Sequence, residues 1–150
     1  MACSVAQSLE IVGEWWTLLI IRDAFLGVRR FEDFQRRLGV SRNVLTERLA
    51  TLVRNGILAP VPYNDHPPRS EYRLTDKGRD LYPVVVSLRQ WGDRWLQEGP
   101  LPVVVRHDAC GHEAVAILVC DHCGGAIDAR NVSASGAVVP ARVAQPVPAT

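Results

Sequence analysis

The chain of 150 residues has little of several features that would place it in a specialised class. Its purely apolar runs, such as 18–21 and 115–119, fall far below the ~18 residues that a membrane helix needs. Its four cysteines are too few for a disulfide scaffold in a chain of this length. No basic stretch followed by an apolar one opens the chain, so no signal peptide is expected. These absences predict a cytoplasmic protein without a membrane partner.

Lysine is also nearly absent, since Lys77 is the only one and arginine carries the remaining positive charge. The net charge of +1 conceals an uneven distribution, because residues 22–79 hold 12 Lys and Arg against 7 Asp and Glu. Both flanking segments carry a net negative charge. A basic segment attracts polyanions, chiefly nucleic acid, although a solvated arginine-rich surface would have the same composition.

With 47% apolar residues the chain can fold as one domain plus a small appendage. Short helices are predicted over 4–12 and over 14–26. The second is apolar nearly all round, so we expect it to be buried. Phe31, Phe34 and Leu38 then lie at helical spacing, Gly39 ends that helix, and Ser41 is a good N-cap for another over about 42–54. Two helices joined by a tight turn with glycine are typical of a helix-turn-helix. No internal repeat is expected.

The outward face of the helix over 42–54 is rich in side chains that read base edges or hold phosphates. An ordinary solvated helix face would also be polar. If the helix enters a major groove, Arg42, Asn43 and Thr46 would contact bases, and Ser41 and Arg48 would contact phosphates.

Two alternating segments, 57–63 and 70–74, predict a β-hairpin directly after the helix-turn-helix, which makes a winged helix. Ile57, Ala59, Val61 and Tyr63 are expected to point inward, and prolines between them restrict the first strand to an edge or an irregular strand. Arg69 and Arg73 would reach phosphates from this wing.

One long helix is predicted over 76–98, capped by Thr75 and kinked near its first turns by Pro83. Its apolar stripe repeats at spacings of three and four residues. Packing on its own domain explains part of the stripe, but two tryptophans on one stripe favour a dimer. The predicted interface residues are Leu81, Val84, Leu88, Trp91 and Trp95.

Beyond a boundary at 99–102, the segment 99–130 holds most of the cysteines and histidines. His107 and Cys110 have two residues between them, as have Cys120 and Cys123, and glycine follows each pair. Two such turns joined by a strand over 114–119 predict a zinc-ribbon-like unit with a structural Zn²⁺. His112 or His122 could replace His107. A reactive thiol pair and inert thiols are the alternatives. The segment 131–150 is predicted to be a disordered tail.

Several motifs together give residues 3–98 a resemblance to the HxlR-type winged helix-turn-helix transcriptional regulators, which are related to the MarR group. They are Cys3 with Val5, then Gly13, Trp16, Leu19 and Ile20, the whole of 29–58, the wing segment PPRSEYRLTDKG, and LYPVV with LRQWGDRW in the last helix. The resemblance implies homodimers held by the terminal helices. It also implies that the second helix of the motif enters the DNA major groove and that the wing lies on the DNA backbone. The zinc-like segment is an addition to this pattern.

Some members of that family sense thiol-reactive compounds through a cysteine near the N-terminus, and Cys3 matches its position. Such members often have proline after the cysteine, where this chain has Ser4. The resemblance therefore implies Cys3 as a candidate redox sensor.

We expect a mainly helical α+β fold. Residues 1–98 would form a winged helix-turn-helix domain that binds double-stranded DNA as a homodimer. The function expected is transcriptional repression at a palindromic operator in the nucleoid, in response either to an unidentified small-molecule effector or to a change at a cysteine thiol. A protein–protein adaptor built on the same units is the alternative. No paired carboxylates or nucleophile–base arrangement is visible, so the protein is not expected to be an enzyme.

Overall fold

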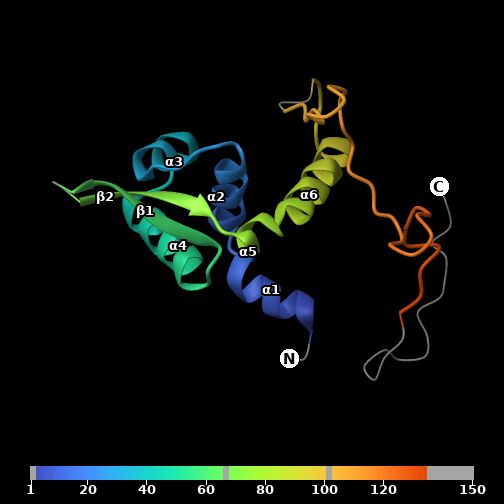
Figure 1. Cartoon of the computed structure of the whole chain (residues 1–150), viewed down its shortest axis with the longest axis horizontal. Helices are drawn as coiled ribbons and strands as arrows, with labels where there is room; N and C mark the ends of the chain where they lie inside the picture. The colour runs from blue at the N-terminus through green and yellow to red at the C-terminus, as the bar shows by residue number, and fades with distance from the viewer. Residues whose placement is uncertain (1–2, 66–67, 101–102, 135–150) are drawn as a thin grey trace. The chain divides into compact units, whose positions relative to one another are not determined.

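A computed structural model describes residues 3–65, 68–100 and 103–134 of the chain (Figure 1). The chain forms two compact units, unit 1 over Met1–Pro100 and unit 2 over Leu101–Thr150. Within these described ranges, no helix has the length and apolar character needed to cross a membrane. Most of the predicted tail, from residue 135 onward, lies outside the described residues.

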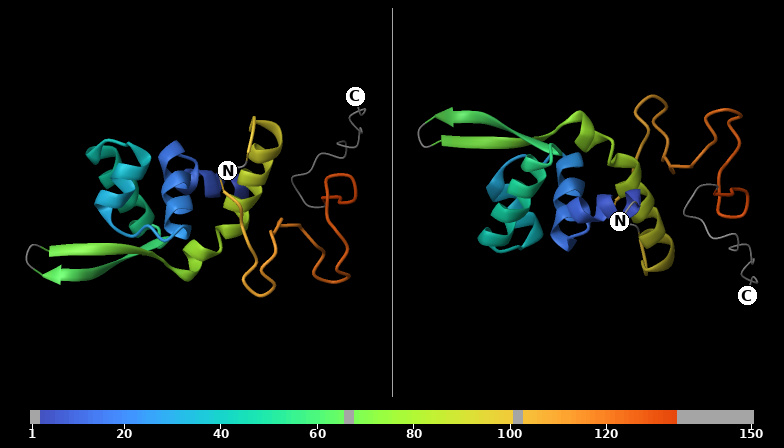
Figure 2. Two further views of the ribbon diagram at one scale, coloured as in Figure 1. Left: turned by 90° about the horizontal axis from the view of Figure 1, so that it is seen from above. Right: turned by 90° about the horizontal axis from the view of Figure 1, so that it is seen from below.

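Unit 1 is mainly helical with one small antiparallel sheet, which confirms the predicted winged helix. Both views in Figure 2 place the tip of the β-ribbon at one end of this unit and α1 and α6 at the other. Its elements in order are α1 (Ser4–Val12), α2 (Trp15–Phe25), α3 (Phe31–Leu38), α4 (Arg42–Arg54), β1 (Leu58–Asp65), β2 (Pro68–Leu74), α5 (Asp76–Arg79) and α6 (Tyr82–Trp95).

Local sequence signals set the ends of the helix-turn-helix, as predicted. Gly39 ends α3 with a φ of 65°, in the left-handed region that favours glycine. Ser41 caps α4, and its hydroxyl accepts the N–H of Val44. The turn between the helices therefore needs only three residues, which fixes the two helices close together.

The core of unit 1 lies between α2, α3 and α4. Leu45, Leu49 and Leu52 form the buried stripe of α4. They belong to one apolar cluster with Ile20 and Ile21 of α2, and all five are at most 1% exposed. Burial of this stripe leaves only the opposite face of α4 for an external partner.

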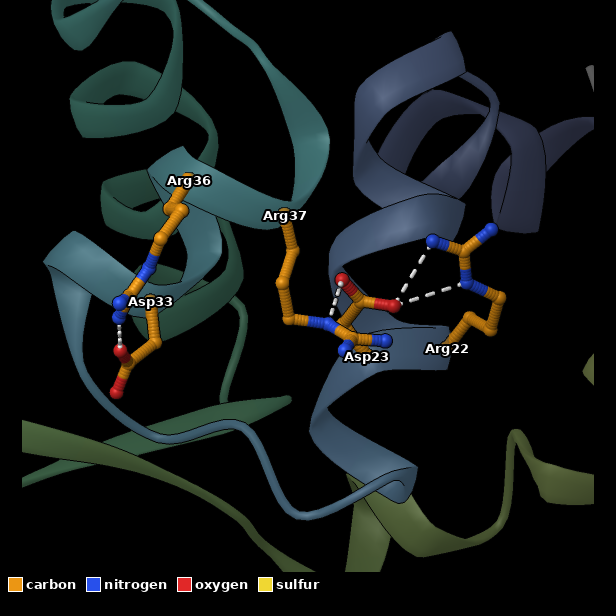
Figure 3. A network of polar contacts seen from close by, with 5 residues as sticks. All are labelled: Arg22, Asp23, Asp33, Arg36 and Arg37. Carbon is orange, nitrogen blue, oxygen red and sulfur yellow. Dashed lines mark hydrogen bonds and ion pairs between the residues drawn. The ribbon is translucent and has the colours of Figure 1, made fainter.

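A buried carboxylate joins α2 to α3 (Figure 3). Asp23 of α2 is 0% exposed and accepts hydrogen bonds from Arg22 Nε at 3.0 Å and Arg22 Nη2 at 2.8 Å. Its other oxygen accepts from Nε of Arg37, in the last turn of α3, at 3.2 Å. The nearby Asp33–Arg36 pair lies within α3 and bridges no second helix. Asp23 is thus the polar link that fixes the first helix of the motif to the core.

The wing is longer than predicted, and its predicted inward face is only partly buried. Strands β1 and β2 pair antiparallel from Leu58↔Leu74 to Asp65↔Pro68. Val61 and Tyr63 were expected inward but are 37% and 39% exposed, because a two-stranded ribbon extends past the core. Both strands are edges, so the prolines of β1 cost little pairing.

The prediction of one long helix over 76–98 is wrong, because the structure forms two helices in this segment. The short α5 ends at Arg79, and α6 begins at Tyr82 with Pro83 in its first turn. Proline has no N–H to donate and its ring clashes with the carbonyl four residues earlier, so the helix breaks rather than kinks. The break gives α6 a direction independent of α5.

Unit 2 contains two tight turns and little regular structure. Isolated bridges pair Arg106 with Glu113 and Val119 with Ala126. The expected strand over 114–119 is not formed, since residues 114–118 have no regular secondary structure. No residue in the described part of unit 2 is fully buried, so no apolar core forms there.

Candidate functional site

The exposed face of α4 carries the predicted base-reading side chains. Arg42, Asn43 and Thr46 are all exposed within the first two turns of the helix, and Ser41, which was predicted to contact phosphate, is the exposed N-cap residue. The guanidinium of Arg42 lies over the Phe31 ring, 4.9 Å from its centroid, which supports it at the surface. This face presents donors and acceptors in the part of a recognition helix that meets base edges.

The arginines predicted to contact phosphates have different surroundings. Arg48 is the least accessible, with its side chain 20% exposed and paired at 3.1 Å with the neighbouring Glu47. Arg69 lies on β2 beside the wing tip, is exposed and forms no ion pair within the described residues. Arg73 pairs with Glu71 at 3.1 Å and is half-exposed. Arg69 therefore has the most freely available charge of the three.

A cluster midway along the wing, where Glu71 pairs with Val61, was not predicted from the sequence. Glu71 accepts hydrogen bonds from Arg73 at 3.1 Å and from Arg30 at 3.4 Å, and Arg30 also lies over the Tyr63 ring. The Arg73 hydrogen bond above all lowers the pKa of the Glu71 carboxyl, against partial burial, and Arg30 lowers it further. A folded-state pKa below the unfolded one means that the cluster stabilises the wing at neutral pH. This contribution is lost as the pH falls through the lowered pKa.

Side chains 41 residues apart form this cluster, so no local pattern could have revealed it. A backbone hydrogen bond from Tyr72 N–H to the Arg29 carbonyl, 2.7 Å long, lies beside it. Together these contacts fix the direction of the wing relative to α3.

An apolar surface is exposed on α6. Of the predicted stripe, Val84, Leu88, Trp91 and Trp95 are 50–64% exposed. Leu81 packs instead against the core of its own domain, because it lies in the turn before α6. We call the four exposed residues the α6 stripe.

Helix α1 lies at the same end of unit 1 as α6 (Figure 2), and the N-terminal helices expose further apolar side chains. Val5 and Leu9 of α1 are 67% and 55% exposed, whereas Val12 is buried in the core. Trp15 begins α2 and is 76% exposed, although α2 was expected to be buried nearly all round. Exposed apolar surface of this extent is typical of an interface.

Cys3 is the residue immediately before α1. Its thiol is exposed, and its carbonyl accepts the N–H of Gln7 in the first turn of the helix. An oxidant can therefore reach it from solvent.

The predicted metal ligands fall into two pairs. In the first, His107 Nδ1 lies 3.4 Å from Cys110 Sγ. In the second, the backbone N–H groups of Cys123 and His122 point at Cys120 and lower the pKa of its thiol, with a smaller effect of the Cys123 side chain. Within the described ranges, no three of these residues, or of any His, Cys, Asp and Glu, converge on one point.

A family model described as HxlR-like helix-turn-helix matches residues 11–100. The chain belongs to this family. It is 53% identical over 132 residues to an HTH-type transcriptional regulator of Mycobacterium tuberculosis (strain H37Rv). The aligned residues make up 87% of this chain and 83% of that relative. HTH-type regulators of Bacillus subtilis match a shorter part, as in YdeP at 32% identity over 62% of this chain and 73% of the relative.

Solved structures share the fold. PA1607, whose structure was reported as that of a candidate transcription factor, is 37% identical with a TM-score of 0.78. That match covers 89% of this chain and 94% of PA1607, so it extends beyond unit 1 into unit 2. The oxidised form of the redox regulator HypR is 31% identical with a TM-score of 0.59, over 64% of this chain and all of HypR.

Membership of the family makes this chain a transcriptional regulator with a helix-turn-helix fold. The family acts on DNA. Transcriptional regulators are not enzymes, so family membership confirms the expectation that this chain is not an enzyme.

Proposed function

We propose that this HxlR-like protein binds a palindromic operator as a homodimer and represses transcription. The observation that carries the proposal is the presence of two different surfaces at opposite ends of unit 1 (Figure 2). One is the polar face of α4 with the wing, and the other is the α6 stripe with the exposed apolar residues of α1 and α2.

The polar face supports DNA recognition because its residues match the chemistry of base edges and phosphates. Arginine makes two hydrogen bonds to guanine, asparagine makes two to adenine, and Ser and Thr contact either bases or phosphates. Arg42 and Asn43 lie in the first turn of α4 and Thr46 begins the second, and all three would read bases. Ser41, Arg48 and Arg69 would hold the backbone, and Arg73 would do so from within its ion pair with Glu71.

The α6 stripe supports the homodimer because it is apolar, lies on one face of a helix and leaves two tryptophans in water. A second copy presents the same stripe, so a two-fold arrangement buries both at once. Two-fold symmetry of the protein requires a palindromic operator, with its half-sites about 34–36 Å apart for two recognition helices in successive major grooves. Repression requires only that the bound dimer occupies the promoter, with no further partner surface.

Arginine substitutions on α4 and on the wing should affect DNA binding differently. We expect Arg42→Ala to cost about 1–3 kcal/mol of operator affinity and to relax specificity at one base position. Arg69→Ala should weaken binding equally on all sequences and should lower the salt slope by about 1. Operator selection from a random library, followed by fluorescence anisotropy at several salt concentrations, measures both effects.

The same titration separates DNA binding from an adaptor function. Six to ten phosphate contacts would lower affinity by about 10³–10⁵-fold between 50 and 200 mM salt. An apolar adaptor contact would be almost insensitive to salt. A uniform loss for Arg42→Ala would move Arg42 to the phosphate group, and failure to select any sequence would contradict site-specific binding. Unfolding measurements on each variant control for the loss of the Arg42–Phe31 contact.

We also propose that oxidation of Cys3 changes operator affinity, an idea supported by its exposed position and by the similarity to the redox regulator HypR. Treatment with a thiol oxidant should change the affinity of the wild-type protein at least several-fold. Cys3→Ser should bind the operator normally and lose this response. Because Cys110, Cys120 and Cys123 remain in that variant, a response that persists in Cys3→Ser would assign the effect to unit 2 and contradict the proposal.

A further inference from the structure

Unit 2 contains a structural repeat that the sequence analysis did not find. Residues 105–114 and 118–127, offset by 13 positions, share Asp, Cys and Gly at equivalent places and little else. Their backbones form the same hydrogen bonds, and each stretch carries one of the two isolated bridges, at equivalent positions. We call the two stretches the knuckles.

Three hydrogen bonds define each knuckle. The Gly111 N–H donates to the His107 carbonyl at 2.7 Å, and the equivalent Gly124 N–H donates to Cys120 at 2.8 Å. The N–H of His107 donates to the carbonyl five residues later at 2.9 Å, as that of Cys120 does at 2.8 Å. The N–H of Ala114 donates to the Val105 carbonyl at 2.8 Å, and the equivalent bond from Ile127 to Leu118 measures 2.9 Å.

A glycine completes the turn in both knuckles. Gly111 and Gly124 both have a φ of 71°, a left-handed conformation that a residue with a side chain adopts at a cost. The conformation lets the chain reverse directly after Cys110 and Cys123. Two short loops of different sequence have therefore adopted one geometry, which holds the first and fourth side chains of each loop on the same side of a turn.

The occupants of the equivalent positions indicate the chemistry. The fourth position is Cys110 in one knuckle and Cys123 in the other, while the first is His107 in one and Cys120 in the other. Histidine and cysteine cannot replace each other in a disulfide or as thiols, but both are ligands of zinc. The equivalence also favours His107 over His112 and His122, whose equivalents in the other knuckle, Gly125 and Ala109, have no ligating atom.

The spacing within the first pair fits a tetrahedral ion. With Zn–N of about 2.0–2.1 Å and Zn–S of about 2.3 Å, tetrahedral geometry separates the two ligand atoms by about 3.6 Å. The observed separation of His107 Nδ1 and Cys110 Sγ is 3.4 Å. The first pair therefore already has the separation that two ligands of one tetrahedral ion require, without the second pair.

Nothing else in the described part of unit 2 could hold the two knuckles together. Its apolar side chains between the knuckles are solvent-exposed, with Val115 at 74% and Ile117 at 73%, and Leu118, which begins the second knuckle, is 64% exposed. A segment of this size normally needs a metal or disulfides to fold, and all three of its cysteines are free.

We propose that His107, Cys110, Cys120 and Cys123 bind one Zn²⁺ that closes the two knuckles into a single structural site. The nine residues between Cys110 and Cys120 could extend to roughly 30 Å, so they can bring one pair to the other. The three thiols release their protons to solvent on binding, which leaves one imidazole and three thiolates around the ion. Four protein ligands leave no open position, so the ion stabilises structure and activates no water.

Metal analysis of the full chain, purified without chelator, tests the site. We expect one zinc ion per chain, and Co²⁺ added to the apo-protein should give the visible bands of a tetrahedral thiolate site. Single substitutions Cys110→Ser, Cys120→Ser, Cys123→Ser and His107→Ala should each abolish these bands. The matched controls His112→Ala, His122→Ala and Cys3→Ser should retain them.

Each other result overturns part or all of the proposal. Loss of the bands in His112→Ala or His122→Ala, with His107→Ala unaffected, would show that the ligand assignment is wrong. Absence of metal, or a mass lower by two hydrogens from a Cys120–Cys123 disulfide, would exclude the site. Limited proteolysis gives a readout independent of spectra, since zinc should protect residues 103–131 and a chelator should remove that protection. Circular dichroism from the helices of unit 1 confirms that each variant is folded.

Discussion

Replacing Leu88 and Trp91 together by glutamate should convert the protein to a monomer and abolish tight operator binding. Each α6 stripe would place two carboxylates against the same stripe of its partner, where they would be buried without a cation. Because the native side chains are 53% and 54% exposed in the single chain, the substitutions should leave the fold of unit 1 intact. Loss of the second half-site contact should reduce operator affinity by about 10²–10⁴-fold.

Analytical ultracentrifugation and operator titration measure the two effects on the same samples. Leu26→Glu is the matched control, because Leu26 is 51% exposed and lies at the C-cap of α2, outside the α6 stripe. It introduces the same chemistry and should leave the dimer unchanged. If the double variant still sediments as a dimer, α6 is not the interface and the proposed arrangement on DNA fails with it.

The helices of the motif could be predicted because each of their ends depends on residues close in sequence. Gly39 and Ser41 determine the turn between α3 and α4 wherever the rest of the chain goes. The spacing of His107 with Cys110 and of Cys120 with Cys123 likewise predicted two tight turns, each followed by glycine in the left-handed region. Such local devices are visible in one sequence.

Features that depend on distant contacts could not be predicted in this way. Asp23 lies in an apolar helix. Nothing near it in sequence shows that Arg37, which is 14 residues later and at the far end of α3, donates a hydrogen bond to its carboxylate. The cluster of Glu71 with Arg30 depends on the wing folding back on the start of α3. The strand expected between the knuckles did not form because an apolar run produces a strand only where another strand or a core covers it.

Asp23→Ala should be among the most destabilising single substitutions at a polar site in unit 1. It removes three hydrogen bonds between charged groups from a position that is 0% exposed. Hydrogen bonds to charged groups contribute about 1.5–3 kcal/mol each. The two arginines are about half-exposed and regain water, so we expect a net loss of about 2–3 kcal/mol in the free energy of unfolding. Urea unfolding of the full chain, followed by helix signal, measures this loss.

The Asp33–Arg36 pair supplies the control for this prediction. It joins the same residue types within one turn of α3, with Asp33 42% and Arg36 73% exposed, so Asp33→Asn should cost less than about 0.5 kcal/mol. A double-mutant cycle of Asp23→Ala with Arg37→Ala then isolates the link between α2 and α3, and we expect a coupling of about 1 kcal/mol or more. A coupling near zero would mean that α3 is positioned by Phe34 and its apolar neighbours alone. The variants that lose the Asp23–Arg37 link should also bind the operator more weakly. The reason is that the link fixes α3 to α2, and the position of α3 sets the angle at which α4 enters the groove.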